Sequence, residues 1–419
     1  MVTLPEEYLA LKAERQRGFQ TLYTYSVLTH VDMETGFSLS VCLKDAANGQ
    51  YLKHALIGRK EEGAEIVTPE AHDFKCRYTS VKVEFQNVKF RVESCRGKGV
   101  PLLLLVTPLS QEKMPPLLVL EGGYLWNKPG VVAREKNALL GAAGEKRYAV
   151  YSTAPHDPTD PNLPTQAPYL ATPMAADVAF SVNVRMTIEQ ARRCMAAARE
   201  IYREELNAFE PCRDCGEALM SALSWDTTYD ATRDRVISPV SRLWSIGHGG
   251  YVLFCWDSYF AGFMAAKWDK FLAYSNLIEI TLCRTQAGFV PNFADGTGVK
   301  SEDRSQPPVG SAMLLETYRI HREKWIVEFL FPFLLKWNEW FAAHRMEADG
   351  ALCWGSDPYE PRFGNLWESN GVNERFGAAL ESGLDNSPMY DDIPFDSNTH
   401  RMQLKDVGLT GLYILDTRS

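Results

Sequence analysis

Residues up to about Val184 show the pattern of β-strands. Short apolar runs alternate with polar positions or are rich in β-branched and aromatic residues, and Gly- and Asn-containing turns separate them. The runs expected to form strands are 21–27, 37–43, 81–85, 88–92 and 102–106. Many short strands separated by turns predict an antiparallel β-sandwich over residues 1–184. Residues 155–173, which are rich in Pro, Thr and Asp, are expected to be irregular.

The hydrophobic period changes after residue 184. Thr187 and Gln190 form a capping-box pattern, and apolar residues follow at helical spacing, so we expect a linker helix within residues 185–211. Further helices are expected at 214–229, 256–268, 270–286, 310–321, 324–344, around 366 and at 404–415. Long aromatic loops separate them, and loops of that length usually carry function. This multidomain β plus α pattern indicates an (α/α) toroid over residues 212–419.

The charge and the cysteines of the chain indicate which partners, cellular compartment and cofactors to expect. Lys and Arg are scattered along a chain of net charge −9, which argues against nucleic acid and anionic membranes. The sequence shows no signal peptide and no apolar stretch long enough to span a bilayer, so we expect a cytoplasmic protein. Its nine thinly spread cysteines are typical of reduced thiols. Cys212 and Cys215 form a lone CxxC pair, so neither a metal nor another cofactor is expected.

Four loop segments of the helical half carry side chains suited to sugar chemistry. Glycoside hydrolysis needs two carboxylates, and sugar binding needs aromatic faces and polar groups. The segments contain Glu381 with Asp385, Trp256 with Asp257, Arg304 with Gln306, and Trp354. Composition alone also fits structural roles for them, such as a helix N-cap for Asp385 or a buried loop position for Trp354.

The order and spacing of these motifs resemble glycoside hydrolase family 63, the family of the processing α-glucosidase and its bacterial relatives. The motifs are Ser238-Pro-Val-Ser-Arg242 with Trp244, Phe254-Cys-Trp-Asp257, Pro291-Asn292, Arg304-Ser-Gln-Pro-Pro308, Trp354-Gly355 and Glu381-Ser-Gly-Leu-Asp-Asn-Ser-Pro388. The resemblance implies a β-sandwich followed by an (α/α)6 barrel, and inverting hydrolysis of an α-glucosidic or related α-linked bond. It implies that Asp385 is the general acid. The positions it implies for substrate binding are Phe254, Trp256, Asp257, Arg304, Gln306, Trp354, Glu381 and Asn386.

One departure from the family concerns the second carboxylate. The family's general base is a Glu well C-terminal to the acid, whereas only 34 residues follow Asp385 here. We therefore expect an incomplete barrel, with the base outside this chain and with self-association or a second polypeptide completing the barrel. Two other functions stay open: a trehalase-like hydrolase, and a truncated, non-catalytic carbohydrate-binding protein.

Overall fold

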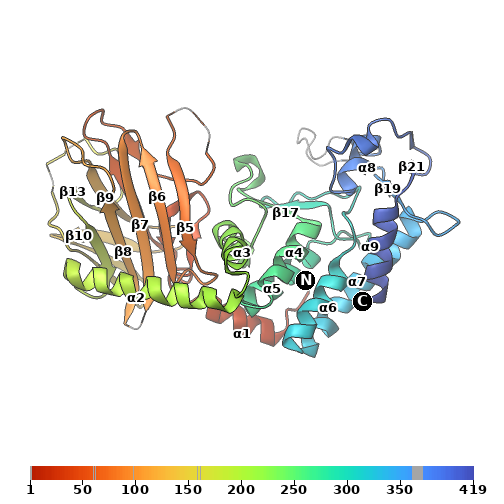
Figure 1. Ribbon diagram of the computed structural model, residues 1–419, viewed down its shortest axis with the longest axis horizontal. Coiled ribbons are helices and arrows are strands. Elements are labelled where there is room, and N and C mark those ends of the chain that lie inside the picture. The colour runs from red at the N-terminus through yellow and green to blue at the C-terminus, as the bar shows by residue number, and fades with distance from the viewer. Residues whose placement is uncertain are drawn as a thin grey trace. The chain divides into compact units, whose positions relative to one another are not determined.

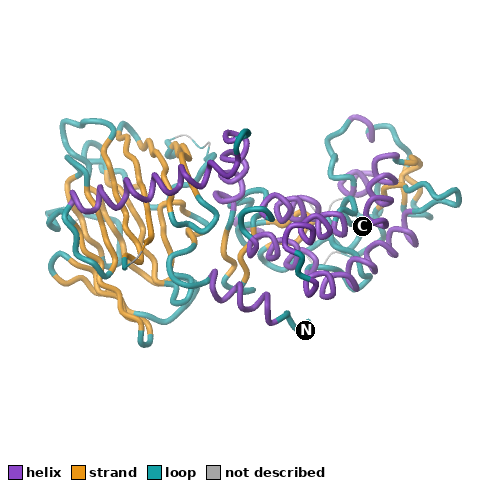
Figure 2. The backbone as a smooth tube through the Cα atoms, turned by 60° about the horizontal axis from the view of Figure 1, so that its bottom comes forward, coloured by secondary structure: helices purple, strands orange, loops and turns teal. Residues whose placement is uncertain are grey.

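The chain forms two compact units in a computed structural model that describes residues 2–59, 61, 63–97, 99–157, 159–160, 162–360 and 371–419. The sandwich unit comprises residues 12–234, and the helical unit comprises residues 1–11 and 235–419. Most strands belong to the first unit and most helices to the second (Figure 2). The domain limits expected from the sequence, at residues 184, 211 and 212, divide the chain more finely and stay a prediction.

Two antiparallel sheets build the sandwich unit (Figure 1), which confirms the expected sandwich. In the first, the order is β1-β2-β3-β9-β13 with β4 beside β3: β1 (Thr21–Tyr23), β2 (Ser26–Val31), β3 (Phe37–Lys44), β4 (Tyr51–Leu52), β9 (Leu117–Tyr124) and β13 (Tyr169–Pro173). In the second, the order is β10-β11-β12-β14-β8-β7-β6-β5: β5 (Ile66–His72), β6 (Tyr78–Phe85), β7 (Val88–Gly97), β8 (Val100–Pro108), β10 (Val131–Glu135), β11 (Ala138–Ala143), β12 (Lys146–Ser152) and β14 (Val178–Val182).

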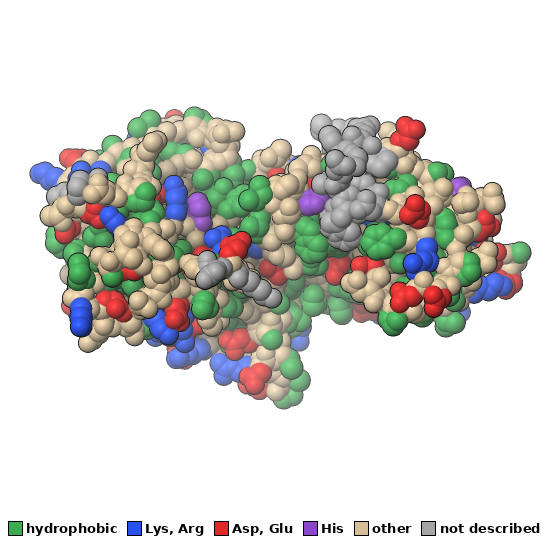
Figure 3. All heavy atoms as spheres, turned by 90° about the horizontal axis from the view of Figure 1, so that it is seen from above, with side chains coloured by type: hydrophobic (Ala, Val, Ile, Leu, Met, Phe, Trp, Pro, Cys, Tyr) green, Lys and Arg blue, Asp and Glu red, His purple; other side chains and the backbone are tan. Residues whose placement is uncertain are grey.

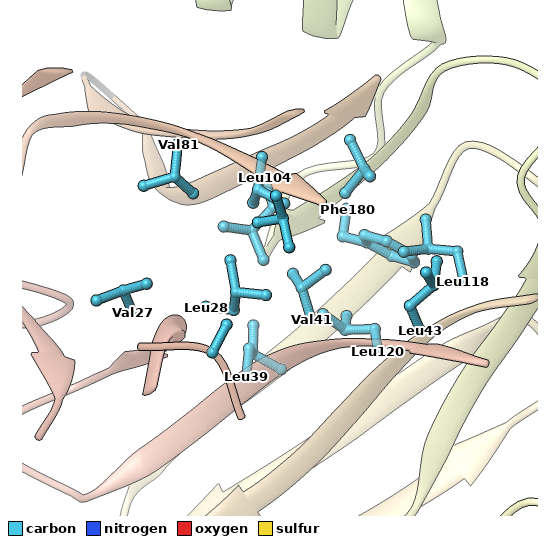
Figure 4. Close-up of a cluster of buried hydrophobic side chains, with 14 of the residues drawn as sticks. Val27, Leu28, Leu39, Val41, Leu43, Val81, Leu104, Leu118, Leu120 and Phe180 are labelled. Carbon is cyan, nitrogen blue, oxygen red and sulfur yellow. The ribbon is translucent and has the colours of Figure 1, made fainter. Parts of the chain in front are cut away.

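The core of this unit lies between the two sheets. Leu39, Val41 and Leu43 alternate along β3 and point to the same side, where they meet Leu104 and Phe180 of the other sheet (Figure 4). Each of the five is at most 1% exposed. Burial of each such side chain stabilises the fold by about 1.5–3 kcal/mol relative to an exposed position.

The last five residues of the segment expected to be irregular, 155–173, are instead strand β13. They pair with β9 in a regular antiparallel register, from Tyr169 opposite Glu121 to Pro173 opposite Leu117. This part of the expectation was wrong because the proline at the end of the run marks the end of a strand, a position that proline tolerates.

Helix α2 (Ile188–Leu206) packs along the second sheet, against β6, β7, β8 and β14 (Figure 1). Its capping box is present: the Gln190 backbone N–H donates to Thr187 Oγ1 at 3.3 Å, and the Thr187 N–H donates to Gln190 Oε1 at 2.8 Å. These bonds satisfy two backbone donors that a helix start leaves free. The 3₁₀ turn Asn207–Phe209, helix α3 (Arg213–Asp226) and strand β15 (Thr228–Asp230) follow in the same unit.

The helical unit contains six long α-helices, one of them shared with the sandwich unit, a shorter one and six short strands among its described residues. They are β16 (Arg235–Ile237), β17 (Val252–Phe254), α4 (Cys255–Ala265), α5 (Lys270–Leu282), β18 (Phe293–Asp295), α6 (Gly310–His321), α7 (Lys324–Arg345), β19 (Cys353–Gly355), α8 (Arg375–Glu381), β20 (Phe395–Asp396), β21 (Arg401–Lys405) and α9 (Val407–Arg418), with α1 (Glu6–Arg15) running across the unit boundary at residues 11 and 12. The expected helix at 310–321 has the bounds of α6, whereas α1 and α8 were not expected. The short helix expected around residue 366 lies outside the described residues.

The surface carries both signs of charge. Acidic and basic side chains are interspersed over the face shown in Figure 3. None of the helices in the described parts of the chain is both long enough and apolar enough to cross a membrane.

Candidate functional site

The start of α4 places Trp256 and Asp257 in the helical unit. Strand β17 pairs with β18, Phe254 opposite Phe293, and ends where α4 begins. Phe254 cannot cap the helix with its side chain, and two loop residues take that role. The Cys255 N–H donates to the backbone oxygen of Asn292 at 3.1 Å. The backbone N–H of Trp256 donates to the side-chain Oε1 of Gln306 at 3.2 Å. Two of the free donors of the first helical turn are thereby satisfied.

Asn292 joins three of the motif segments. Its backbone oxygen accepts the bond from Cys255, and its N–H donates to the Arg304 oxygen at 3.2 Å. Its side chain donates to the Leu380 oxygen at 3.1 Å, next to Glu381. Asn292 is 4% exposed, so these bonds form in an environment where unpaired polar groups are costly. The residue therefore fixes the start of α4, the 303–308 loop and the end of α8 relative to one another.

Glu381 forms a buried ion pair with Arg345, and neither side chain is exposed. Arg345 Nε donates to Glu381 Oε2 at 2.7 Å and Nη2 donates to Oε1 at 3.1 Å. The backbone N–H groups of Ser305 and Gly355 donate to the same carboxylate at 3.0 and 2.7 Å. All four bonds are donated to Glu381, an arrangement that an ionised carboxylate satisfies fully and a protonated acid does not. Burial raises the pKa of Glu381, and the guanidinium of Arg345 opposes that effect.

This geometry gives Glu381 a positioning role. We expected a loop to begin at Glu381, but the residue belongs to the last turn of α8. Its carboxylate holds the end of α7, strand β19 and the 303–308 loop together. Direct contact between Glu381 and a sugar stays a prediction.

Arg304, Gln306 and Trp354 are also buried, at 0%, 4% and 3% exposure. The guanidinium of Arg304 donates from Nη1 to both oxygens of Asp303, at 3.0 and 2.8 Å. The indole N–H of Trp354 donates to Asp406 Oδ2 at 2.9 Å. Together with the bond that Gln306 accepts from the start of α4, these bonds make the three residues part of the framework of the site. Their contact with substrate is a prediction that the structure does not test.

Asp385 and Asn386 lie in the turn that follows α8. Asp385 is half-buried and Asn386 is exposed, and neither side chain forms a hydrogen bond with any described residue. Ser387, rather than Asp385, caps the 3₁₀ turn at Pro388–Tyr390, because its hydroxyl oxygen accepts the Met389 N–H. The carboxylate of Asp385 is therefore not engaged by the described part of the chain.

Gly383 brings this turn against Trp256. Its φ is +68°, a conformation that favours glycine, and a Cβ atom at this position would lie 2.6 Å from Cζ2 of Trp256. The indole therefore packs directly on the backbone between Glu381 and Asp385. The segment with Trp256 and the segment with Asp385, which the family resemblance assigns to one site, are therefore neighbours in the structure.

Asp257 carries a half-buried carboxylate in the first turn of α4. Burial raises the pKa of Asp257, and no cation pairs with it among the described residues. A half-buried carboxylate without a counter-charge beside an aromatic side chain is typical of functional sites. No group of three His, Cys, Asp or Glu side chains in the described segments has an arrangement suited to a metal ion.

Two contacts in this part of the helical unit could not be predicted from the sequence. Arg345, the last residue of α7, gives no sign in the sequence that it pairs with Glu381, since basic residues are common at helix ends. His248 contacts Asp295 through Nδ1 at 2.8 Å, and Gly249 and Gly296 let their loops cross at a distance that a Cβ would prevent. The Gly-rich run around His248 therefore serves close backbone packing.

Comparison with known proteins gives one match to a protein family. Residues 250–414 match the family model of the mannosylglycerate hydrolase MGH1-like glycoside hydrolase domain. The expected similarity to glycoside hydrolases is thereby confirmed for these residues, and family 63 itself stays a prediction. No curated protein matches the chain.

Among solved structures, the chain is similar to a bacterial glucoamylase complexed with acarbose. The sequence identity is 10% and the TM-score is 0.43, and the alignment covers 96% of this chain and 66% of the glucoamylase chain. This chain therefore spans less than two thirds of the length of that protein.

Proposed function

We propose that this protein is a glycosidase that hydrolyses α-glucosidic or related α-linked bonds with inversion. The observation that carries the proposal is the match of residues 250–414 to a glycoside hydrolase domain. All nine residues assigned to the site from the sequence, from Phe254 to Asn386, fall within that stretch. The contact between Trp256 and the turn before Asp385 supports the same proposal, because it joins the aromatic and acidic parts of the site.

Asp385 is the general acid in this mechanism. Its carboxyl group donates a proton to the glycosidic oxygen while a second carboxylate activates water on the opposite face of the sugar. In inverting enzymes the two carboxyl groups are about 6.5–9.5 Å apart, which leaves room for that water. Asp257 accepts hydrogen bonds from sugar hydroxyls, and Trp256 offers its ring to a sugar face. Glu381 holds the surrounding loops, in addition to the sugar contact that the resemblance implies for it.

We also propose that association with a second copy or another polypeptide supplies the second carboxylate and completes a helical barrel. An apolar groove of about 490 Å³ between α6, α7 and α9 supports this part of the proposal. Phe331 and Leu335 of α7 line it and are 58% and 43% exposed. Exposed apolar surface of this kind favours association. A monodisperse monomer in size-exclusion chromatography with light scattering would contradict it.

We place the protein in the cytoplasm, a reducing compartment. None of its nine cysteines is bridged, and Cys212 and Cys215 are exposed. Free exposed thiols are typical of such compartments.

The test is hydrolysis by the full chain, with the product anomer followed by NMR. The panel comprises α-linked glucose disaccharides, trehalose, and the glycerate glycosides of mannose and glucose, the former suggested by the name of the matched family. We expect turnover with inversion, and at least a hundredfold loss of rate in Asp385→Asn. Asp392→Asn, at an exposed position nearby, is the matched control and keeps the parent rate.

The outcomes separate the alternatives. A preference for trehalose favours the trehalase-like hydrolase. Calorimetric binding of sugar without turnover favours the carbohydrate-binding protein. Full activity in Asp385→Asn would show that the acid is misassigned.

A further inference from the structure

A second, polar cleft lies in the sandwich unit, where α2 and α3 meet strands β5, β6 and β7. Its volume is about 430 Å³, which suits a small molecule. Four arginines line it, and we call it the arginine cleft: Arg91, Arg199, Arg203 and Arg213. A concentration of guanidinium groups is unexpected in a chain whose net charge is −9.

Two of these arginines are held in place by acidic partners. Arg91 donates to both oxygens of Glu70, at 2.7 and 3.1 Å. Arg199 donates from Nη2 to Glu93 at 2.7 Å. Burial acts against ionisation of Glu70, but hydrogen bonds that include those from Arg91 lower the pKa of Glu70 to about 2. The two pairs therefore fix the planes of two guanidinium groups at neutral pH.

The other two arginines have donors to spare. Arg203 donates one long bond, 3.4 Å, to the exposed side chain of Glu200. The side chain of Arg213 donates no hydrogen bond and forms no ion pair within the described residues. The remaining acid in the lining, Glu217, accepts a single 3.4 Å bond, from Tyr202, among the described residues. The cleft therefore has more cationic donors than its own acids engage.

We propose that the arginine cleft binds a small sugar that carries a carboxylate or phosphate group. Guanidinium groups present paired N–H donors that match the oxygens of either anion. Glu217, whose carboxylate is little engaged by the described residues, accepts hydrogen bonds from hydroxyl groups, which an inorganic anion lacks. Tyr78 and Tyr202, whose ring centroids are 5.6 Å apart, add apolar surface to the lining.

This binding site does not depend on the proposed glycosidase activity. Every residue that lines the arginine cleft belongs to the sandwich unit, and every residue assigned to hydrolysis belongs to the helical unit. Loss of one function by mutation is therefore separable from loss of the other.

The test is isothermal titration calorimetry of the full chain with D-glucuronate, D-glucose 6-phosphate, D-glucose and inorganic phosphate. We expect at least one of the two anionic sugars to bind more tightly than glucose or phosphate, and the stronger of them identifies the anionic group. Arg213→Gln should weaken that binding about tenfold or more, because it removes charge-assisted hydrogen bonds. Arg193→Gln, which makes the same change at an exposed position of α2 outside the cleft, should bind like the parent.

Three results would overturn the proposal. They are equal binding of glucose and the anionic sugars, unchanged binding in Arg213→Gln, and no binding of any probe at millimolar concentration. Equal binding of inorganic phosphate and glucose 6-phosphate would overturn its sugar part. Unfolding of the variant is not expected, since the side chain of Arg213 makes no bond with the described residues, and equal melting temperatures of the two variants verify this.

Discussion

Replacing Glu381 by Gln tests whether this carboxylate holds the candidate site together. The substitution keeps the size of the side chain but replaces one acceptor oxygen by an NH2 group. That group would face two donors, a backbone N–H and an Arg345 nitrogen, where the parent has bonds of 2.7 Å. It would also leave the guanidinium of Arg345 fully buried with Asp357 as its remaining carboxylate partner among the described residues.

The expected loss of stability follows from these contacts. Breaking a buried ion pair by removing one partner costs about 3–5 kcal/mol. Native domains are stable by about 5–15 kcal/mol, so the loss is a large part of the whole. For a unit of this size, each kcal/mol lowers the melting temperature by about 2–4 °C. We therefore expect Glu381→Gln to melt about 6–20 °C below the parent.

The measurement is thermal unfolding followed by tryptophan fluorescence and near-UV circular dichroism. Trp340 reports on the site, because the Arg345 guanidinium lies 4.6 Å from its ring centre. Asp385→Asn is the matched control, since Asp385 forms no side-chain bond with the described residues, and it should change the stability by about 0.5 kcal/mol or less. The two carboxylates, four positions apart, should therefore separate into one that holds the fold and one that supports activity.

A result within about 1 kcal/mol of the parent would refute this reasoning, because that is the contribution of an ordinary hydrogen bond rather than of a buried ion pair. The double variant Glu381→Leu with Arg345→Met checks the cause. If the ion pair is responsible, the double variant loses less than the sum of the single changes.

Two further predictions concern Glu70 and Gly383. Glu70→Gln should lower the free energy of unfolding at pH 7 by about 1 kcal/mol, a value reduced for solvent exposure. Because the pKa of Glu70 is about 2 in the folded protein, its contribution is present above pH 5 and is lost as the pH falls toward 2, so urea unfolding at several pH values should show the two proteins converge. Gly383→Ala should lower activity at least tenfold, because the new Cβ would meet Trp256 at 2.6 Å. Gly350→Ala has a comparable φ of +87° with no atom within 4 Å, so it should keep activity, and equal rates in the two glycine variants would contradict the packing argument.

The sequence predicted those helices and strands whose formation depends on residues close together in the chain. The Thr187 and Gln190 pattern predicted the start of α2, because both partners of the capping box lie within one helical turn. The alternation in residues 37–43 predicted β3, because a strand places every second side chain on one face. Helix α8 was not predicted, since its seven residues include a glycine and lack a side-chain cap.

The candidate site was predicted in its residue types but not in its contacts. Glu381 takes its bonds from Arg345 and Ser305, which lie 36 and 76 residues away in the sequence. No periodicity connects such positions, so the sequence does not distinguish a buried structural carboxylate from an accessible one. The contact of Trp256 with Gly383 depends on a left-handed glycine whose partner lies still further away in the sequence. The sequence therefore identified the segments that form the site. The structure separates the residues that hold these segments together from those whose carboxylates are accessible.

The bonds of Asn292 also determine when in folding the site can form. One of them reaches across 88 residues to Leu380, and loop closure over such distances is slow compared with helix formation. During synthesis, helices α4 to α7 can form before the end of α8 is available, but the arrangement around Trp256 cannot. The site is therefore expected to be one of the last parts of the helical unit to mature.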